Sequence, residues 1–252
     1  MKKLSLLTLM LILGIDVFAQ SENPVTISGQ AIDFNGQPID SCLIDLMHPD
    51  FSSAYSTYTD KNGYYKLENV EKGQYMALYA IRPNEYPREN KVAEKDMRLE
   101  FWAWNVVADR DLVINPRYHK LELYGTNVFQ VMGGYSGFFI YFRPMSVTKY
   151  ISYQKENYLD KKKMEEKGIN ISVSLEYLDI KVFADNEFLK INSITPVEEY
   201  SGTISITGYI VQVEAPKEKS DKPYIVFRVE VENKESNEKG ENLYFYELKN
   251  YK

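Results

Sequence analysis

Two tryptophans in one short apolar stretch are the residues of this chain with the clearest binding chemistry. Trp102 and Trp104 lie two positions apart, so in a β-strand they point to one face while Phe101 points to the other. Flat aromatic faces stack on sugar rings, and the indole N–H adds a polar handle. A sandwich core also needs large side chains, so this spacing predicts either a ligand platform or a core cluster.

A second group of aromatic residues falls near a predicted turn. Two predicted strands, 120–131 and 137–143, form a hairpin with Tyr135 and Phe138 at its tip. A hairpin tip has no core to fill, so aromatic side chains there are candidates for binding. Tyr118 precedes the first strand and is placed to join such a surface. The candidate ligand-binding residues are therefore Tyr118, Trp102, Trp104, Tyr135 and Phe138.

The sequence contains no recognisable catalytic or metal-binding motif. His48 and His119 fall in different predicted domains, and no cysteine cluster accompanies them. Cys42 is the only cysteine, which excludes an intramolecular disulfide, and its strand-like context predicts a buried structural thiol. We expect no metal, no cofactor and no catalytic residue. A glycosidase-like pair among the 36 acidic residues is the enzymatic alternative.

Charge and the first residues bear on location and partners. The formal net charge is −6 at pH 7, and an acidic chain is not suited to bind nucleic acid or anionic lipid. Lys2 and Lys3, an apolar run over 4–15 and the small residue Ala19 are typical of a signal peptide, cleaved after Ala19. No later apolar run is long enough to span a membrane. We expect an exported protein: periplasmic, cell-surface or extracellular.

The first region is organised around a turn at residues 59–63. Its Asp-x-Asn-Gly motif places residues that tolerate positive φ where a hairpin needs them. The Tyr-, Ser- and Thr-rich run 54–59 precedes the turn, and 64–67 follows it with an aromatic pair. Both runs suit half-buried strands. Gly73 then interrupts the chain, and 74–81 is a further predicted strand.

Four elements of this region occur in the order of a known family. They are VTISGQAID at 25–33, NGQPI at 35–39, TDKNGYY at 59–65 and GQY at 73–75. Together they resemble the carboxypeptidase-regulatory-like domain, a small transthyretin-like β-sandwich of exported proteins. The resemblance covers residues 25–81, under a third of the chain. It implies a fold and no catalytic residue. The family belongs to a wider carbohydrate-binding-like group, which favours a glycan ligand slightly.

The pattern predicts a signal peptide and two domains. The signal peptide covers 1–19, and the carboxypeptidase-regulatory-like domain covers 20–82. The polar, proline-containing stretch 83–96 is interpreted as a linker. Short alternating strands over 97–252 predict a larger immunoglobulin-like sandwich, with a helical insertion near 147–167. The predicted fold class is therefore all-β, with two sandwiches in sequence.

These features favour a non-catalytic exported binding or accessory protein, whose ligand is a glycan or another cell-envelope protein. One alternative is a structural spacer with no ligand of its own. A second is a carbohydrate-active enzyme with an unrecognised carboxylate pair. Exposed aromatic residues would favour binding, buried ones would favour the spacer, and an acidic pair in a deep cleft would favour the enzyme.

Overall fold

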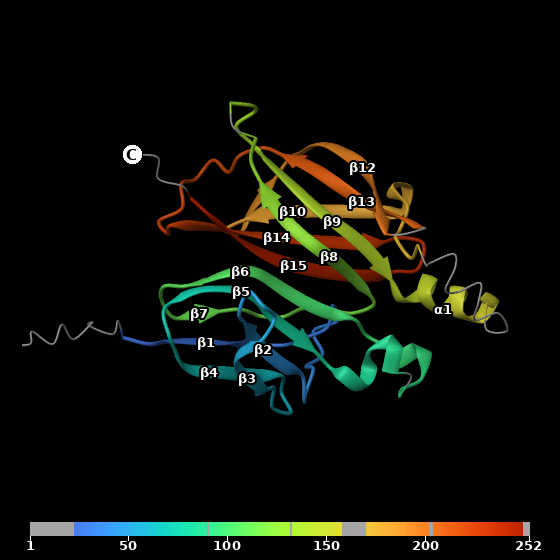
Figure 1. The fold of residues 1–252 in the computed structure, drawn as a ribbon, viewed down its shortest axis with the longest axis horizontal. Helices are drawn as coiled ribbons and strands as arrows, with labels where there is room; N and C mark the ends of the chain where they lie inside the picture. Colours follow the sequence, from blue (N-terminus) through green and yellow to red (C-terminus); the bar gives the residue numbers. More distant parts are fainter. Residues whose placement is uncertain (1–22, 90, 132, 158–169, 202–203, 249–252) are drawn as a thin grey trace, which may run out of the picture.

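The computed structural model describes five stretches of the chain: residues 23–89, 91–131, 133–157, 170–201 and 204–248. Most of these residues lie in β-strands, which confirms the all-β prediction (Figure 1). The predicted signal peptide, 1–19, and the end of the predicted helical insertion, 158–167, lie outside the described residues. Within the described stretches, no helix is long and apolar enough to cross a bilayer.

The first half of the chain folds into a small β-sandwich. A three-stranded sheet in the order β4-β1-β7 packs against β2, β3, β5 and β6 of a larger sheet. The core between them includes the fully buried side chains of Ile27, Ile44, Leu78 and Phe101. The strands are β1 (Val25–Gln30), β2 (Leu43–Met47), β3 (Ser53–Tyr58), β4 (Tyr64–Val70), β5 (Gly73–Ile81), β6 (Glu100–Ala108) and β7 (Leu112–Val113).

Two Asp-x-Asn-Gly turns shape this sandwich. The Oδ1 atom of Asp60 accepts the backbone N–H groups of Asn62 and Tyr64, at 2.8 and 2.9 Å. Asp33 accepts the equivalent pair of N–H groups in the first turn. Gly63 has a φ of 79°, which lies in the left-handed region that glycine adopts without strain. The predicted turn with positive φ at Gly63 is therefore confirmed, but the predicted hairpin is wrong: β3 pairs with β2 and β4 pairs with β1, so the turn connects the two sheets.

Replacing Gly63 by valine is expected to lower the free energy of unfolding by about 1–3 kcal/mol, the range for a strained backbone site. A Cβ atom at this position would collide with the carbonyl oxygen of Ala31 in addition to the positive φ. Gly73→Val is the matched control, because a Cβ there meets no atom within 4 Å. Chemical denaturation of both variants measures the difference. Equal losses at the two positions would contradict the role of the turn.

The second sandwich encloses its own core. A four-stranded sheet in the order β12-β13-β9-β8 covers one half of the larger sheet, strands β11, β10, β14 and β15. Leu123, Phe142, Val211 and Phe227 are fully buried between them. The strands are β8 (Leu121–Phe129), β9 (Phe138–Ser146), β10 (Leu178–Ala184), β11 (Glu187–Leu189), β12 (Ile191–Ser201), β13 (Ile204–Val213), β14 (Tyr224–Asn233) and β15 (Glu238–Glu247).

A single α-helix is described, α1 (Val147–Asn157), and it confirms the first part of the predicted helical insertion. The buried carboxylate of Glu238 binds the first turn of this helix. Its Oε1 atom accepts the backbone N–H of Thr148 at 2.8 Å and the hydroxyl of the same residue at 2.9 Å. A carboxylate also interacts favourably with the positive end of the helix dipole. The contact therefore fixes α1 to the hairpin of β14 and β15.

The two sandwiches share one eight-stranded sheet, in the order β11-β10-β14-β15-β6-β5-β2-β3. Strands β15 and β6 pair in parallel at residues 243–244 and 103–104. On β14, Tyr224 packs in the first core and its neighbour Ile225 packs in the second. Adjacent residues of a strand point to opposite faces. The sandwiches therefore lie on opposite faces of the shared sheet, displaced along it (Figure 1).

The stretch 83–96 does not connect the two sandwiches, as a linker would, but connects two paired strands. It forms the short 3-10 helices η1 (Pro83–Glu85), η2 (Pro87–Glu89) and η3 (Glu94–Asp96). These connect β5 to β6, which pair antiparallel with each other. Phe101 on β6 packs in the first core. The strand after 83–96 therefore completes the first sandwich, and the chain enters the second sandwich only at β8.

Candidate ligand-binding groove

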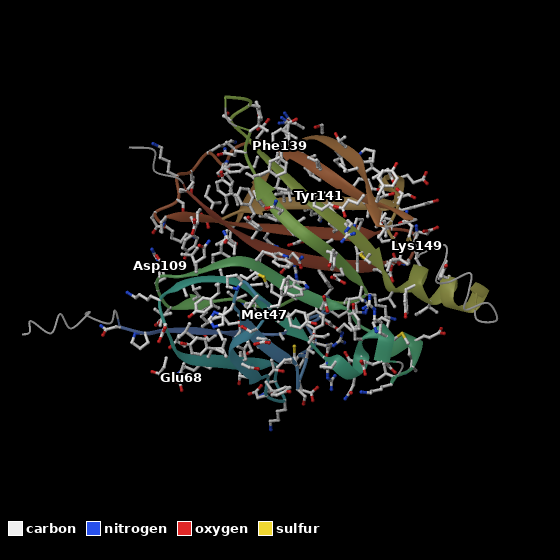
Figure 2. All side chains as sticks on the ribbon, viewed as in Figure 1. Met47, Glu68, Asp109, Phe139, Tyr141 and Lys149 are labelled. Atoms are coloured by element: carbon white, nitrogen blue, oxygen red, sulfur yellow. The ribbon has the colours of Figure 1, made fainter. Side chains whose placement is uncertain are left out.

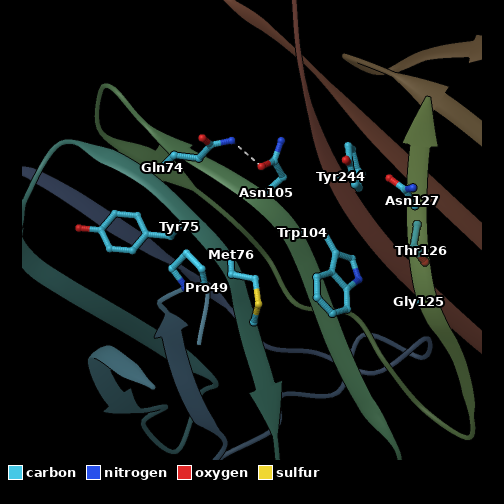
Figure 3. Close-up of a pocket in the computed structure, with 10 residues that line it drawn as sticks. All are labelled: Pro49, Gln74, Tyr75, Met76, Trp104, Asn105, Gly125, Thr126, Asn127 and Tyr244. Carbon is cyan, nitrogen blue, oxygen red and sulfur yellow. Dashed lines mark hydrogen bonds between the residues drawn. The ribbon is translucent and has the colours of Figure 1, made fainter. Parts of the chain in front are cut away.

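A groove of about 510 Å³ lies where the edge strand β8 of the four-stranded sheet runs above the shared sheet. Figure 3 shows its walls, which come from β5, β6, β8, β15 and the turn after β2. The segments are distant in sequence, and only the shared sheet brings them together. The lining residues are Pro49, Gln74, Tyr75, Met76, Trp104, Asn105, Gly125, Thr126, Asn127 and Tyr244.

Trp104 is the aromatic floor of this groove and the outer end of a ladder of rings. Its indole stacks on that of Trp102, with 4.5 Å between ring centroids and 7° between planes. The ring of Tyr79 lies 4.4 Å beyond Trp102. Met47 packs on the same face and lies between the two halves of the molecule in Figure 2. We call Tyr79, Trp102 and Trp104 the aromatic ladder. The prediction that both tryptophans share a face is confirmed.

A left-handed residue, Asn105, follows Trp104 in β6. Asn105 has a φ of 57°, a conformation that asparagine tolerates better than most residues. Before it, Phe101 and Ala103 point into the first core, and after it Val106 and Ala108 do so. The alternation of the strand therefore shifts by one residue at Asn105. The shift places the Asn105 side chain at the rim, beside the tryptophan.

Hydrogen bonds hold the Asn105 amide in place. Its Nδ2 atom donates to the carbonyl oxygen of Phe245 at 2.7 Å, which links β6 to β15. Its Oδ1 atom accepts from Nε2 of Gln74 at 2.5 Å, a contact drawn in Figure 3. The Gln74 side chain is exposed. The rim thus carries an ordered pair of amides next to an aromatic surface.

The opposite wall is shaped by a β-bulge. The register between β8 and β9 shifts by one residue after Tyr124, and Gly125 there has a φ of 67°. The buried amide of Asn242 fixes this bulge to the shared sheet. It donates to the carbonyl oxygen of Leu123 at 2.7 Å and to Oγ1 of Thr126 at 3.0 Å. It also accepts the backbone N–H of Trp102 at 3.2 Å. Both walls are therefore built from backbone irregularities with satisfied polar contacts.

Two properties of the lining restrict what the groove can bind. None of its ten lining side chains is charged, although 26% of the residues of the chain are Asp, Glu, Lys or Arg. The indole nitrogen of Trp104 is buried and has no hydrogen-bond partner among the described residues. Leaving a buried donor unpaired costs about 1–3 kcal/mol. The uncharged lining suits an uncharged occupant, whereas the indole nitrogen of Trp104 is covered by protein.

The structure separates the candidate aromatic residues into two groups. Trp104 is half-buried in the groove, and Tyr135 is 48% exposed at the hairpin tip, where Asn192 donates to its hydroxyl at 3.3 Å. Three other candidates do not form an accessible surface, because they fill cores. Tyr118 is fully buried, its hydroxyl 3.2 Å from Sγ of Cys42, and Phe138 is buried against Phe227. The third, Trp102, is the buried middle ring of the ladder.

A buried carboxyl pair, Glu100 and Glu122, lies at the inner end of the aromatic ladder. The Oε2 atom of Glu100 accepts the Tyr79 hydroxyl at 2.7 Å, and its Oε1 atom accepts the Trp102 indole N–H at 2.9 Å. Burial raises the pKa of Glu122 well above its usual range, and the adjacent charge of Glu100 and a hydrogen bond with it raise the pKa further. Glu122 therefore keeps its proton to a higher pH than a free glutamate does.

Glu122→Gln is expected to raise the free energy of unfolding at neutral pH. Because the pKa of Glu122 is higher in the folded than in the unfolded chain, the folded state binds more protons between the two values. Stability therefore falls as the pH rises through that window, and glutamine removes this loss. Urea unfolding at about pH 5 and about pH 8 measures it. The exposed Glu176→Gln is the control, and a wild-type-like pH dependence in Glu122→Gln would contradict the account.

Among the described residues, no group of three or more His, Cys, Asp or Glu side chains is arranged to hold a metal ion. Cys42 is buried, which confirms the predicted structural thiol, and burial raises its pKa to about 11. The residues that the sequence analysis missed are mainly polar groups of the groove, Asn105, Asn127 and Gln74. Two signals in the sequence could have identified the groove: an asparagine directly after an apolar strand run, and a glycine inside a strand.

Comparisons with known proteins identify no family. No protein-family model and no curated protein matches the chain. Among solved structures, the chain is similar to the major pilin subunit BcpA of Bacillus cereus at 9% identity and a TM-score of 0.27, covering 88% of this chain and 69% of the pilin. It is also similar to the full-length major pilin SpaD from Corynebacterium diphtheriae, at 10% identity and a TM-score of 0.23, covering 89% and 65%. Similarity at this level supports no conclusion about function.

Proposed function

We propose that this chain is a non-catalytic, exported binding protein whose groove takes a neutral glycan. The observation that carries the proposal is an uncharged groove with an aromatic floor, at Trp104. A charged ligand would leave water without finding a counterion among the lining residues. A neutral ligand with flat apolar faces loses little hydration free energy when it enters the groove, and it gains a ring to stack on.

The polar groups at the rim match the hydroxyl groups of a sugar. Amides such as Gln74, Asn105 and Asn127 both donate and accept hydrogen bonds, as hydroxyl groups do. The ring of Trp104 offers a flat surface for the apolar face of a sugar. A pyranose stacked near Trp104 would bring its apolar face to the ring and its edge hydroxyls to the amides.

The two alternative functions fit the same geometry less well. A spacer has no use for a half-buried tryptophan on the floor of an uncharged groove. An enzyme of the carboxylate-pair type needs its acids in a cleft. Neither Glu100 nor Glu122 lines the groove. Both oxygens of Glu100 already accept hydrogen bonds. A cell-envelope protein as occupant is an outcome that the experiment below distinguishes.

The proposal includes a family relation for the first sandwich. We propose that residues 25–81 form a carboxypeptidase-regulatory-like domain, on the order of its strands and its two Asp-x-Asn-Gly turns. Export by a signal peptide over 1–19 is part of the same proposal. Strand β6 would then extend this domain beyond the matched residues.

The proposed function is tested by titrating residues 20–252 with neutral hexasaccharides of glucose, mannose, xylose and N-acetylglucosamine, and with oligogalacturonate as the charged comparison. Isothermal calorimetry is the readout. We expect saturable binding of at least one neutral sugar and none of oligogalacturonate. Binding of the charged sugar alone, or of none of the sugars, would overturn the proposal and favour a protein ligand or a spacer.

A further inference from the structure

The buried carboxyl pair and the groove are joined by an unbroken series of contacts. Glu122 lies beside Glu100, and Glu100 accepts the indole N–H of Trp102 at 2.9 Å. Trp102 stacks on Trp104, with 4.5 Å between centroids and 7° between planes. Trp104 is the floor of the groove. Each contact is direct, so a displacement of Glu100 reaches the groove through two side chains.

We propose that the carboxyl pair is a proton-controlled latch for the groove: release of the proton that Glu122 holds beside Glu100 loosens the Trp102–Trp104 stack and reshapes the floor. With the proton present, one carboxyl group donates to the other, and Glu100 holds Tyr79 and Trp102 in register. Without it, two buried negative charges repel each other at close range. Glu100 then moves, and Trp102 loses the acceptor of its N–H.

The surroundings of the pair do not supply enough positive charge to cancel this effect. Arg143 and Arg88 lower the pKa of Glu122, but burial and Glu100 outweigh them. Arg143 is also engaged elsewhere, since it pairs with Glu199 at 3.1 Å and lies over the ring of Tyr124. The groups that face the pair from the packed elements are Tyr79 on β5, Trp102 on β6, Tyr86 and Arg88 in the turns after β5, Arg143 on β9 and, beyond Tyr86, Tyr150 on α1.

The direction of the switch follows from the protonation state. The raised pKa of Glu122 means that the latch stays closed above the pH at which a free glutamate loses its proton, and opens as the pH rises further. The tyrosine hydroxyl groups nearby do not compete, because burial and adjacent acids raise the pKa values of Tyr79 and Tyr86 far above 10. That the latch regulates glycan binding rests on the proposed function. The pH-dependent change in the Trp102–Trp104 stack does not depend on it.

The test uses the two tryptophans, which are the only ones in the chain. Near-ultraviolet circular dichroism reports their stacking, and fluorescence quenching by acrylamide reports access to Trp104. Both are measured without sugar, from acid to alkaline pH, on residues 20–252. We expect one transition above the usual range of glutamate, with loss of the stacked-indole signal and increased quenching. In Glu122→Gln this transition is expected to be absent, and in exposed Glu176→Gln it is expected to match wild type.

Trp102→Phe tests whether the change at Glu100 reaches Trp104 through Trp102 or through a general loosening of the fold. The variant removes the N–H that Glu100 accepts and keeps a ring under Trp104. Its acrylamide quenching is expected to be independent of pH. A flat profile in the wild type, or the same transition in Glu122→Gln, would overturn the latch. Sugar titrations at the two ends of the transition test the proposed function separately. A latch that switches in a protein that binds no sugar would refute only the glycan proposal.

Discussion

A chain that begins at Lys95 will unfold at a much lower denaturant concentration than residues 20–252. Such a chain keeps β6 but loses β5, which pairs with β6 along its length. It also loses the rest of the first core, in which Phe101 and Val106 are fully buried. Tyr224 and Phe245, from β14 and β15, pack in the same core and would be uncovered too.

The size of this effect follows from the number of side chains exposed. Burial of one large apolar side chain contributes about 1.5–3 kcal/mol, and a domain has a net stability of about 5–15 kcal/mol. Uncovering four such side chains therefore removes most of the stability. A chain that begins at His119 is the control, since it lacks β6 and keeps the entire second core. Equal denaturation midpoints for the Lys95 chain and the full chain would show that the shared sheet is not a single cooperative unit.

Trp104→Ala is expected to weaken glycan binding strongly while leaving the protein folded. The indole is half-buried and packs on the outer face of the sheet, away from both main cores. Truncation of a central aromatic contact at a binding site typically costs 2 kcal/mol or more. A loss of about 2 kcal/mol weakens the Kd roughly 30-fold. The measurements are calorimetric titration and thermal melting of the variant and the wild type.

Tyr135→Ala is the matched control, because Tyr135 is an exposed aromatic residue that does not line the groove. Its affinity for the same sugar is expected to equal that of the wild type. The roles would be reversed if Tyr135→Ala lost binding and Trp104→Ala kept it. If the Trp104→Ala protein failed to melt cooperatively, the role of Trp104 would be structural and not in binding.

Local signals in the sequence were enough to predict much of the fold. The Asp-x-Asn-Gly turns, the alternation of β14 and the pairing of β8 with β9 all depend on residues close together in the chain. The common face of Trp102 and Trp104 follows from strand geometry alone. These predictions hold because turn chemistry and strand periodicity need no tertiary information.

The organisation of the sheets could not be predicted in the same way. A polar, proline-containing stretch such as 83–96 is typical of a linker, yet here it spans the gap between two paired strands. The parallel contact of β15 with β6 joins residues about 140 positions apart. No local pattern encodes such a pairing. The boundary between the sandwiches therefore depends on the core in which Phe101 is buried. Only the folded chain shows which core that is.

The groove was only partly predictable for the same reason. Trp104 was a candidate, but Tyr244 and Asn127 reach it from β15 and β8. The left-handed Asn105, whose amide lies at the rim, is hydrogen-bonded to Phe245 on the distant strand β15. Spacing alone also left Tyr118 and Phe138 as candidates, because an aromatic residue beside a turn is equally able to fill a core.

The most direct test of a glycan groove is the indole N–H signal of Trp104 in a ¹H–¹⁵N correlation spectrum. The chain has two tryptophans, and the Trp102 N–H donates to Glu100, whereas that of Trp104 has no partner among the described residues. During titration with a neutral sugar that binds, we expect a saturable shift of the Trp104 signal as the sugar stacks on its ring. A sugar that binds while the Trp104 signal stays in place would contradict the account.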